Sequence, residues 1–105
     1  MIDAKVTRVI DGDTFEVTAK FKVRMDFIDA PETSGAEKVK GDISKLWLKN
    51  RIEGKTVQLE VKDQDTYDRF LSVVYLGETN INKEMVQRQL AEIYSPYTHD
   101  DGKQN

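Results

Sequence analysis

Acidic side chains gather where a strand-like run of this chain meets a proline. Asp29 ends a run in which apolar and polar residues alternate, Pro31 follows two residues later, and Glu32 comes next. Proline has no backbone N–H and stops a sheet ladder, so it holds Asp29 and Glu32 on one rigid corner. Two carboxylates at this spacing fit a shared site. They also fit a plain turn in which Asp29 caps the backbone and Glu32 begins a solvated loop.

Two further turns carry charged side chains. Asp13 belongs to the tight turn Asp11-Gly12-Asp13-Thr14, and Arg69 ends the stretch Asp65-Thr66-Tyr67-Asp68-Arg69 just before another strand-like run. Taken singly, neither turn is specific. An Asp-Gly hairpin turn is common, and an arginine beside a strand is more often a surface ion-pair residue.

The combination of these residue types is more informative than each turn alone. Carboxylate and carbonyl oxygens are the ligands that Ca²⁺ and Mg²⁺ prefer, and guanidinium groups match the oxygens of a phosphodiester. The set therefore predicts phosphoryl chemistry. It comprises three acids on turns, two arginines on or beside strands and one tyrosine: Asp13, Asp29, Glu32, Arg24, Arg69 and Tyr67.

Five short runs have the alternation of half-buried strands. Val23, Met25 and Phe27, for example, alternate with two charged residues, and one apolar face suits an antiparallel sheet. The dipeptide Asp11-Gly12 predicts a hairpin between the first two runs, because glycine accepts a positive φ. The runs are Ala4 to Ile10, Thr14 to Thr18, Lys22 to Ile28, Thr56 to Val61 and Phe70 to Leu76.

Helical spacing appears twice. Ile43, Leu46, Trp47 and Ile52 predict a helix between the third and fourth runs, with an N-cap at Gly41-Asp42 and a C′ glycine at Gly54. A second helix is predicted from about Asn82 to Leu90, where Met85, Val86 and Leu90 share a face and the stretch from Asn80 to Asn82 offers caps.

This order of elements predicts an α+β fold that is mainly β. Three strands, a helix, two more strands and a final helix match a five-stranded Greek-key barrel of the OB type. SH3-like barrels and half-sandwiches share much of the same pattern. The predicted domain covers residues 1–94, and the polar segment 95–105 is expected to be a flexible tail.

Composition restricts the class of protein. The 105 residues fit one domain, and a net charge of -3 argues against a protein that holds nucleic acid mainly by bulk electrostatics. The chain has no cysteine and no long apolar run, which excludes disulfides, thiolate metal sites and a membrane span. No leader opens the chain, so we expect a secreted protein if a signal peptide has been removed and a cytoplasmic one otherwise.

At the charged turns the chain resembles the staphylococcal nuclease (thermonuclease) family. The resemblance rests on four stretches that occur in the family's order and together cover roughly residues 4 to 99. They are Val9-Ile10-Asp11-Gly12-Asp13-Thr14, Arg24 through Thr33, Asp65-Thr66-Tyr67-Asp68-Arg69-Phe70-Leu71, and Asn82 to Ala91.

The resemblance implies a role for each matching residue. Asp13 and Asp29 would ligate Ca²⁺ together with the carbonyl of Ala30, and Glu32 would hold or deprotonate the attacking water. Arg24 and Arg69 would clamp the phosphate and stabilise charge in the transition state. The implied pocket for the nucleotide is lined by Tyr67 and Tyr94.

The implied reaction is hydrolysis of single-stranded or frayed DNA and RNA, both within strands and from their ends. Water attacks phosphorus, the 5′-oxygen leaves, and the product carries a 3′-phosphate. Ca²⁺ is the implied cofactor. No membrane and no obligate protein partner is implied.

Several positions depart from the family's pattern. Asp68 and Gln89 stand where glycine is usual. At Asp68 this predicts either an altered turn or competition with phosphate for Arg69, and at Gln89 a less abrupt bend after the second helix. The segment from Ser34 to Lys40 is shorter, and family members commonly continue past the position of Asn105 into a third helix. His99, in the polar tail, is expected to have no catalytic role.

Two other functions compete with the nuclease. One is an inert OB-fold module that binds nucleic acid or protein, although such modules typically lose the acids or arginines that this chain keeps. The other is an acidic interaction domain, for which the net charge is the only support.

Overall fold

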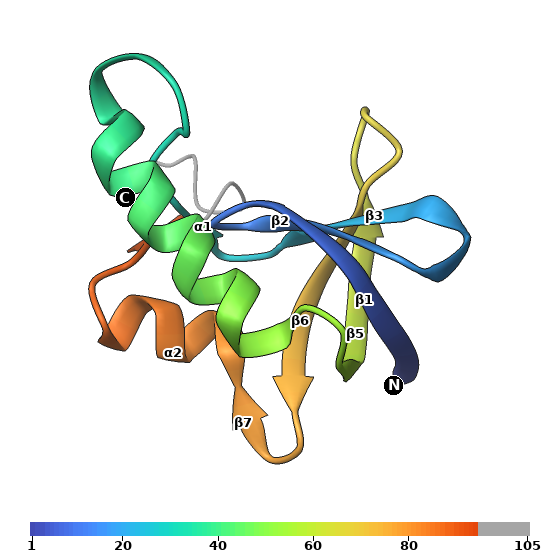
Figure 1. Ribbon diagram of the computed structural model, residues 1–105. Coiled ribbons are helices and arrows are strands. Elements are labelled where there is room, and N and C mark those ends of the chain that lie inside the picture. Colours follow the sequence, from blue (N-terminus) through green and yellow to red (C-terminus); the bar gives the residue numbers. More distant parts are fainter. Residues whose placement is uncertain (95–105) are drawn as a thin grey trace, which may run out of the picture.

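Five strands close into a barrel in the computed structural model of this chain, which describes residues 1–94 (Figure 1). Neighbouring strands run antiparallel in the order β3-β2-β1-β5-β6, and a parallel pairing of β3 with β6 closes the ring. The predicted OB-type barrel is confirmed. Its strands are β1 (Ile2–Asp11), β2 (Thr14–Val17), β3 (Phe21–Met25), β5 (Thr56–Gln64) and β6 (Phe70–Leu76).

Two helices and several short elements complete the described chain. Helix α1 (Lys38–Ile52) precedes β5 and packs chiefly on β1, and α2 (Ile81–Gln87) follows the barrel and packs on β6. The short elements are β4 (Ile28–Asp29), β7 (Thr79–Asn80), β8 (Glu92–Ile93) and the 3₁₀ turns η1 (Thr18–Lys20) and η2 (Gly35–Glu37). No helix within residues 1–94 is both long and apolar enough to span a bilayer. The predicted tail, with His99, lies outside the described residues.

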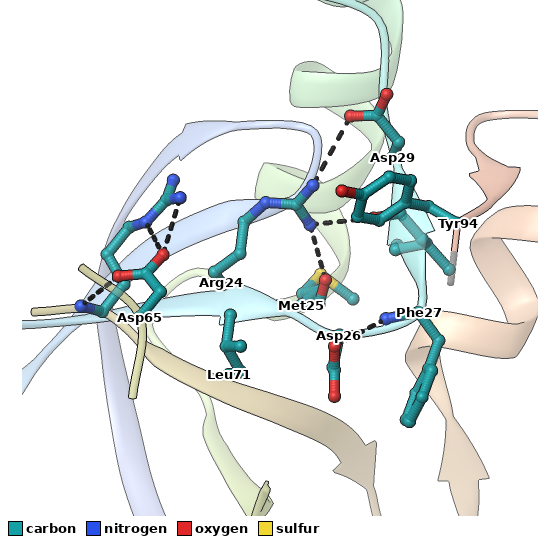
Figure 2. Close-up of a pocket in the computed structure, with 10 residues that line it drawn as sticks. Arg24, Met25, Asp26, Phe27, Asp29, Asp65, Leu71 and Tyr94 are labelled. Atoms are coloured by element: carbon teal, nitrogen blue, oxygen red, sulfur yellow. Dashed lines mark hydrogen bonds and ion pairs between the residues drawn. The ribbon is translucent and has the colours of Figure 1, made fainter. Parts of the chain in front are cut away.

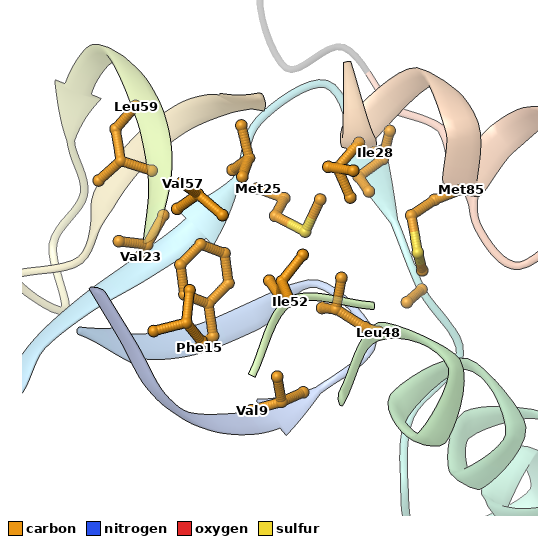
Figure 3. Close-up of a cluster of buried hydrophobic side chains, with 14 of the residues drawn as sticks. Val9, Phe15, Val23, Met25, Ile28, Leu48, Ile52, Val57, Leu59 and Met85 are labelled. Atoms are coloured by element: carbon orange, nitrogen blue, oxygen red, sulfur yellow. The ribbon is translucent and has the colours of Figure 1, made fainter. Parts of the chain in front are cut away.

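The core fills the barrel with side chains that alternate along its strands. Phe15, Val23 and Met25 are fully buried, and Ile52 of α1 reaches the same cluster (Figure 3). Because successive residues of a strand point to opposite faces, Arg24 between Val23 and Met25 points out of the core. The core thus determines the side of β3 on which its charged residues lie.

Glycine is needed at position 12 because neighbouring residues leave no space for a Cβ, and not because of its backbone angle. The predicted hairpin of β1 and β2 is present, with Asp11 paired to Thr14. The positive φ expected at Gly12 is wrong, since the glycines with positive φ in residues 1–94 are Gly35, Gly54 and Gly77. A Cβ at Gly12 would lie 2.7 Å from the Cβ of Ala30 and 2.8 Å from that of Ser44. The turn, the acidic corner and α1 therefore meet here without space for a side chain.

The third strand is shorter than predicted. It ends at Met25, and the Asp26 carboxylate accepts a hydrogen bond from the Phe27 N–H at 3.0 Å, with Phe27 at a φ of 66°. Phe27 is 38% exposed and does not continue the apolar face of Val23 and Met25. Asp29 lies beyond this turn on β4, which pairs with β8. The turn thus separates Asp29 from Arg24 in the chain while leaving them neighbours in space.

Helix α1 begins before the predicted cap at Gly41-Asp42, which is wrong because η2 runs directly into the helix at Lys38. Gly41 is instead buried inside the helix, where a Cβ would overlap the Glu32 carbonyl oxygen. The acidic corner therefore rests directly on the backbone of α1. At the other end, Gly54 takes a φ of 81°, as expected of a C′ glycine.

Helix α2 begins at a cap that the sequence predicts. The Asn80 side chain accepts a hydrogen bond from the Lys83 N–H at 3.0 Å. The helix ends at Gln87, and Gln89 has a φ of 60°, so the expected milder bend is wrong. Asn82 is buried, where its amide donates to the Asp26 carbonyl at 2.8 Å. This bond ties α2 to the turn after β3.

Candidate active site

Three predicted site residues meet at one end of the barrel, each from a different segment. Asp13 comes from the β1–β2 turn, Arg24 from β3 and Asp29 from β4. The Arg24 Nη2 atom lies 3.4 Å from the Asp13 Oδ2 atom and 3.4 Å from the Asp29 Oδ1 atom. Figure 2 shows the contact between Arg24 and Asp29. One guanidinium group therefore bridges the two predicted metal ligands.

Asp13 is fixed by its neighbours. Its Oδ2 atom accepts a hydrogen bond from the Ala30 N–H at 2.8 Å, and its Oδ1 atom accepts one from the Thr14 hydroxyl at 3.1 Å. Asp13 and Ala30 are both buried. The carboxylate thus links the hairpin turn to the acidic corner.

Arg24 is held by backbone carbonyls as well as by carboxylates. Its Nη1 atom donates to the Met25 carbonyl at 2.6 Å and to the Ile28 carbonyl at 2.9 Å, spanning the turn between β3 and β4 (Figure 2). Its side chain is only 15% exposed. Since Nη1 is engaged, the Nη2 edge is the part of the group that faces the two carboxylates.

Negative charge at this end of the barrel exceeds what Arg24 offsets. Burial raises the pKa of Asp11 to about 6, with further contributions from a hydrogen bond and charge repulsion by Asp13. Burial and then the charge of Asp13 raise the pKa of Asp29, against the opposing effect of Arg24. Raised pKa values of this kind indicate carboxylates that a cation would stabilise.

The oxygen atoms at this end of the barrel fit a hard divalent cation, but the protein offers only a few of them. No group of three His, Cys, Asp or Glu side chains within residues 1–94 surrounds a common metal position. Asp13 and Asp29 would supply two carboxylates to such an ion, and Ala30 a backbone carbonyl. Ca²⁺ takes six to eight oxygens, so water and substrate oxygens would complete such a site.

Arg69 lies in the loop between β5 and β6, where Asp65 holds it. The Asp65 Oδ2 atom accepts from the Arg69 Nε atom at 2.8 Å and lies 2.7 Å from Nη2. The Arg69 guanidinium also lies over the ring of Tyr67, 5.3 Å from its centre. Burial alone raises the pKa of Asp65, but hydrogen bonds from Arg69 and Tyr67 outweigh it, and the pKa lies below its usual value.

A pocket of about 430 Å³ brings both arginines together. Arg24, Asp29, Arg69 and Tyr94 all line it. Figure 2 shows Tyr94 beside Asp29 on one side of the pocket and Asp65 on the other. The remaining wall is formed by Met25, Asp26, Phe27, Ile28 and Leu71.

Four predicted site residues do not line this pocket: Asp13, Ala30, Glu32 and Tyr67. Tyr67 lines a separate pocket of about 330 Å³ with Lys22, and Arg69 belongs to both pockets. Glu32 is exposed and does not line the larger pocket, although its backbone is fixed where the N–H donates to the Glu37 carboxylate at 3.2 Å. The structure thus separates the two predicted tyrosines and leaves Glu32 outside the pocket.

The sequence interpretation missed Asp65. Its spacing of four residues from Arg69 is a signal for an ion pair, whereas Asp68 is the acid that directly precedes Arg69 in the sequence. Asp68 has a φ of 60° and closes the turn through its N–H, which donates to the Asp65 carbonyl at 3.1 Å. Of the two effects expected of Asp68, the structure shows the one on the turn, and the carboxylate that binds Arg69 belongs to Asp65.

Comparison with known proteins agrees with this geometry. Residues 22–105 match the family described as staphylococcal nuclease homologue. A protein of Haemophilus influenzae named uncharacterized endonuclease is 42% identical over 100 residues, which is 91% of this chain and 54% of that protein. An Escherichia coli protein of the same name is 37% identical over 103 residues, 94% of this chain and 65% of its own length.

A third relative carries a more specific name. The thermonuclease of Staphylococcus hyicus is 33% identical over 102 residues, covering 88% of this chain and 60% of that protein. The chain thus spans between about half and two thirds of the length of these relatives. On the family match and these identities, the chain belongs to the staphylococcal nuclease family.

Proposed function

We propose that this chain is a Ca²⁺-dependent nuclease that hydrolyses phosphodiester bonds of DNA and RNA and leaves 3′-phosphate products. The observation that supports it most is the convergence of Arg24 and Arg69 on one pocket beside the carboxylates of Asp13 and Asp29. Relatives named endonuclease and thermonuclease support the same activity.

The two arginines bind the scissile phosphate in this proposal. Arg24 binds it with the donors that its contacts to backbone carbonyls and carboxylates leave unused, and Arg69 with the part of its guanidinium that Asp65 leaves unused. Both groups stay charged at all relevant pH values and present paired donors to phosphate oxygens. They stabilise the charge that grows on those oxygens in the transition state.

Asp13, Asp29 and the carbonyl of Ala30 are the residues that would hold Ca²⁺. When bound, the ion supplies a positive charge that draws a phosphate oxygen and offsets its negative charge. The chain itself contributes a fixed Asp13, because Ala30 and Thr14 donate to its two oxygens. Asp29 is more exposed, with 56% of its side chain accessible, and is free to adjust to the ion.

Glu32 orients the attacking water in the proposed reaction. Its backbone packs on Gly41 and donates a hydrogen bond to Glu37, which fixes the position from which its side chain extends. The water oxygen bonds to phosphorus as the bond from phosphorus to the 5′-oxygen breaks. The water gives up a proton to Glu32 or to solvent beside it. The 5′-oxygen takes up a proton from solvent and leaves as a hydroxyl group.

The pocket favours single-stranded or frayed substrate. Tyr94 lines the pocket that the two arginines share and is 47% exposed, so its ring offers an apolar surface there. A base can stack on such a surface only after it has left the duplex. DNA and RNA both supply such bases.

The test is incubation of the chain with single-stranded DNA or RNA, in Ca²⁺ and in excess chelator, followed by analysis of product ends. We expect cleavage in Ca²⁺ alone, with products that carry 3′-phosphate and 5′-hydroxyl groups. Full cleavage in chelator would refute the calcium requirement. Binding of nucleic acid without any cleavage would favour the alternative, a catalytically inert OB-fold binding module.

A further inference from the structure

The two oxygens of the Asp65 carboxylate face different groups. Oδ1 accepts hydrogen bonds from the backbone N–H of Tyr67 and of Arg69, both at 2.9 Å. Oδ2 faces the Arg69 side chain, with Nε at 2.8 Å and Nη2 at 2.7 Å. One oxygen therefore serves the loop backbone and the other serves the arginine.

The loop has backbone closure that does not depend on Oδ2. The Asp65 N–H donates to the Arg69 carbonyl at 2.9 Å, and the Asp68 N–H donates to the Asp65 carbonyl at 3.1 Å. With the two bonds to Oδ1, these interactions define the turn. The contact of Oδ2 with Arg69 is an additional interaction whose loss leaves that turn closed.

Within residues 1–94, this arrangement leaves some donors of Arg69 unused. A guanidinium group has five N–H bonds, and Asp65 engages the one on Nε and one on Nη2. The bonds on Nη1 and the second bond on Nη2 form a complete outer edge. Asp65 and Arg69 both line the larger pocket, and Tyr67 covers a face of the guanidinium. The group is therefore held from behind while its outer edge stays available.

We propose that Asp65 is a positioning residue that holds Arg69 with its outer edge directed at the substrate phosphate. This inference rests on the proposed nuclease function and extends it to a residue that does not touch the substrate. A long, unrestrained arginine must lose rotamer freedom when it binds phosphate, and Asp65 removes much of that loss in advance. Asp65 therefore increases the rate of cleavage only when Arg69 is present.

The first test compares Asp65→Asn with Asp63→Asn. Asparagine retains one carboxylate-like oxygen but places an amide N–H₂ where the other stood, so it cannot serve both the loop and Arg69. Asp63, near the end of β5 and two residues before Asp65, is a matched control, because its carboxylate accepts only from the Gln64 N–H at 2.8 Å among the described residues. We expect kcat to fall about 10- to 100-fold in Asp65→Asn and to stay within about twofold in Asp63→Asn.

The second test is a double-mutant cycle with Arg69→Ala, which alone is expected to lower kcat by roughly 10³- to 10⁵-fold. If Asp65 acts through Arg69, Asp65→Asn has no further effect in the Arg69→Ala background. Where residual cleavage is too slow to measure, the same four proteins can be compared by their affinity for a short single-stranded oligonucleotide in chelator. Additive losses in this cycle would overturn the proposal, as would equal activity of the two asparagine variants.

An NMR measurement makes the test independent of turnover. The Nε–H group of Arg69, bonded to Asp65, is expected to give a resolved and slowly exchanging signal that Asp65→Asn abolishes and Asp63→Asn retains. A signal that persists in Asp65→Asn would overturn the proposed contact. A parent chain that shows this signal but cleaves no nucleic acid would refute the proposed function and leave the Asp65–Arg69 contact intact.

Discussion

Asp68 adopts a backbone conformation that most side chains avoid. Its φ of 60° lies in the left-handed region, where glycine is usual and aspartate is among the better tolerated residues. The turn uses the Asp68 backbone, and the neighbouring Asp65 supplies the carboxylate for Arg69. The replacement of the family's glycine therefore affects the backbone more than the charge around Arg69.

The first prediction concerns Asp68→Gly. Glycine removes a left-handed strain of about 1 kcal/mol but adds freedom to the unfolded chain, so the free energy of unfolding is expected to rise by no more than about 1 kcal/mol. The contact between Asp65 and Arg69 is unchanged, and kcat/KM is expected to change by less than about tenfold, the equivalent of ~1.4 kcal/mol. Urea unfolding and steady-state kinetics measure the two effects. A much larger gain in activity would show that Arg69 is held in an unproductive position.

The second prediction concerns the pH dependence of Asp65. Its pKa in the folded protein lies below the usual value, so the unfolded chain binds more protons in acid. Its contribution to stability is therefore complete above the unfolded pKa, about 3.9, and is lost as the pH falls through the folded pKa. We expect the difference in unfolding free energy between the parent and Asp65→Asn to be constant from neutral pH to about pH 5 and to shrink below about pH 4. A difference that did not change in acid would contradict the contacts assigned to this carboxylate.

At the scale of secondary-structure elements, the acidic corner depends on α1. The carbonyl of Glu32 lies against Gly41 so closely that no side chain fits between them. Gly12 makes a similar contact with Ala30 and Ser44. Two glycines thus set the distance between α1 and the segments that carry Asp13, Asp29 and Glu32.

The third prediction is that Gly41→Ala destabilises the protein, although alanine is the better helix former. Helix propensity favours alanine by about 1 kcal/mol, but a rigid clash with backbone typically costs about 1–3 kcal/mol. We expect a net loss of stability and a fall in kcat, because the new Cβ displaces Glu32. Asn50→Ala, at an exposed position of the same helix, is the control and is expected to alter neither quantity much. Equal stability of parent and Gly41→Ala would argue that the corner moves freely.

At the scale of the whole molecule, the proposed cofactor is expected to stabilise the fold. A ligand that binds only the folded protein adds about 2.7 kcal/mol when its concentration is 100 times its Kd. The fourth prediction is that Ca²⁺ raises the thermal unfolding midpoint and that chelator reverses the change. Asp29→Asn is expected to abolish the increase with little effect in chelator, because Asp29 is largely exposed. An equal increase in parent and variant would exclude Asp29 as a ligand.

Local sequence patterns predict the elements whose own residues determine them. Strand β6 has the predicted bounds, Phe70–Leu76, and Asn80 caps α2 as expected. The failures occur where a distant segment decides. Phe27 leaves the sheet because the chain turns after Met25, so that β4 can pair with β8. Gly41 lies inside a helix because the Glu32 backbone packs against it and leaves no room for a side chain. Neither neighbour can be read from local spacing.

The same distinction applies to the candidate site. Motifs place Asp13, Arg24 and Asp29 in one site, and in the structure Arg24 lies between the two carboxylates. The residue types do not show that Tyr67 and Tyr94 line different pockets, because that depends on how the β5–β6 loop is positioned against β3. The roles of the individual residues stay predictions.

The parallel pairing of β3 with β6 has a consequence for folding. It sets Arg24 opposite Leu71 and joins segments that lie far apart in the chain, on either side of α1 and β5. Contacts of this kind are costly in loop-closure entropy and typically form slowly. Before β3 and β6 pair, the chain has two separate arginines and no common pocket. Affinity for a phosphate-bearing ligand therefore arises only with barrel closure. The rate at which this affinity appears during refolding would measure the rate at which β3 and β6 pair.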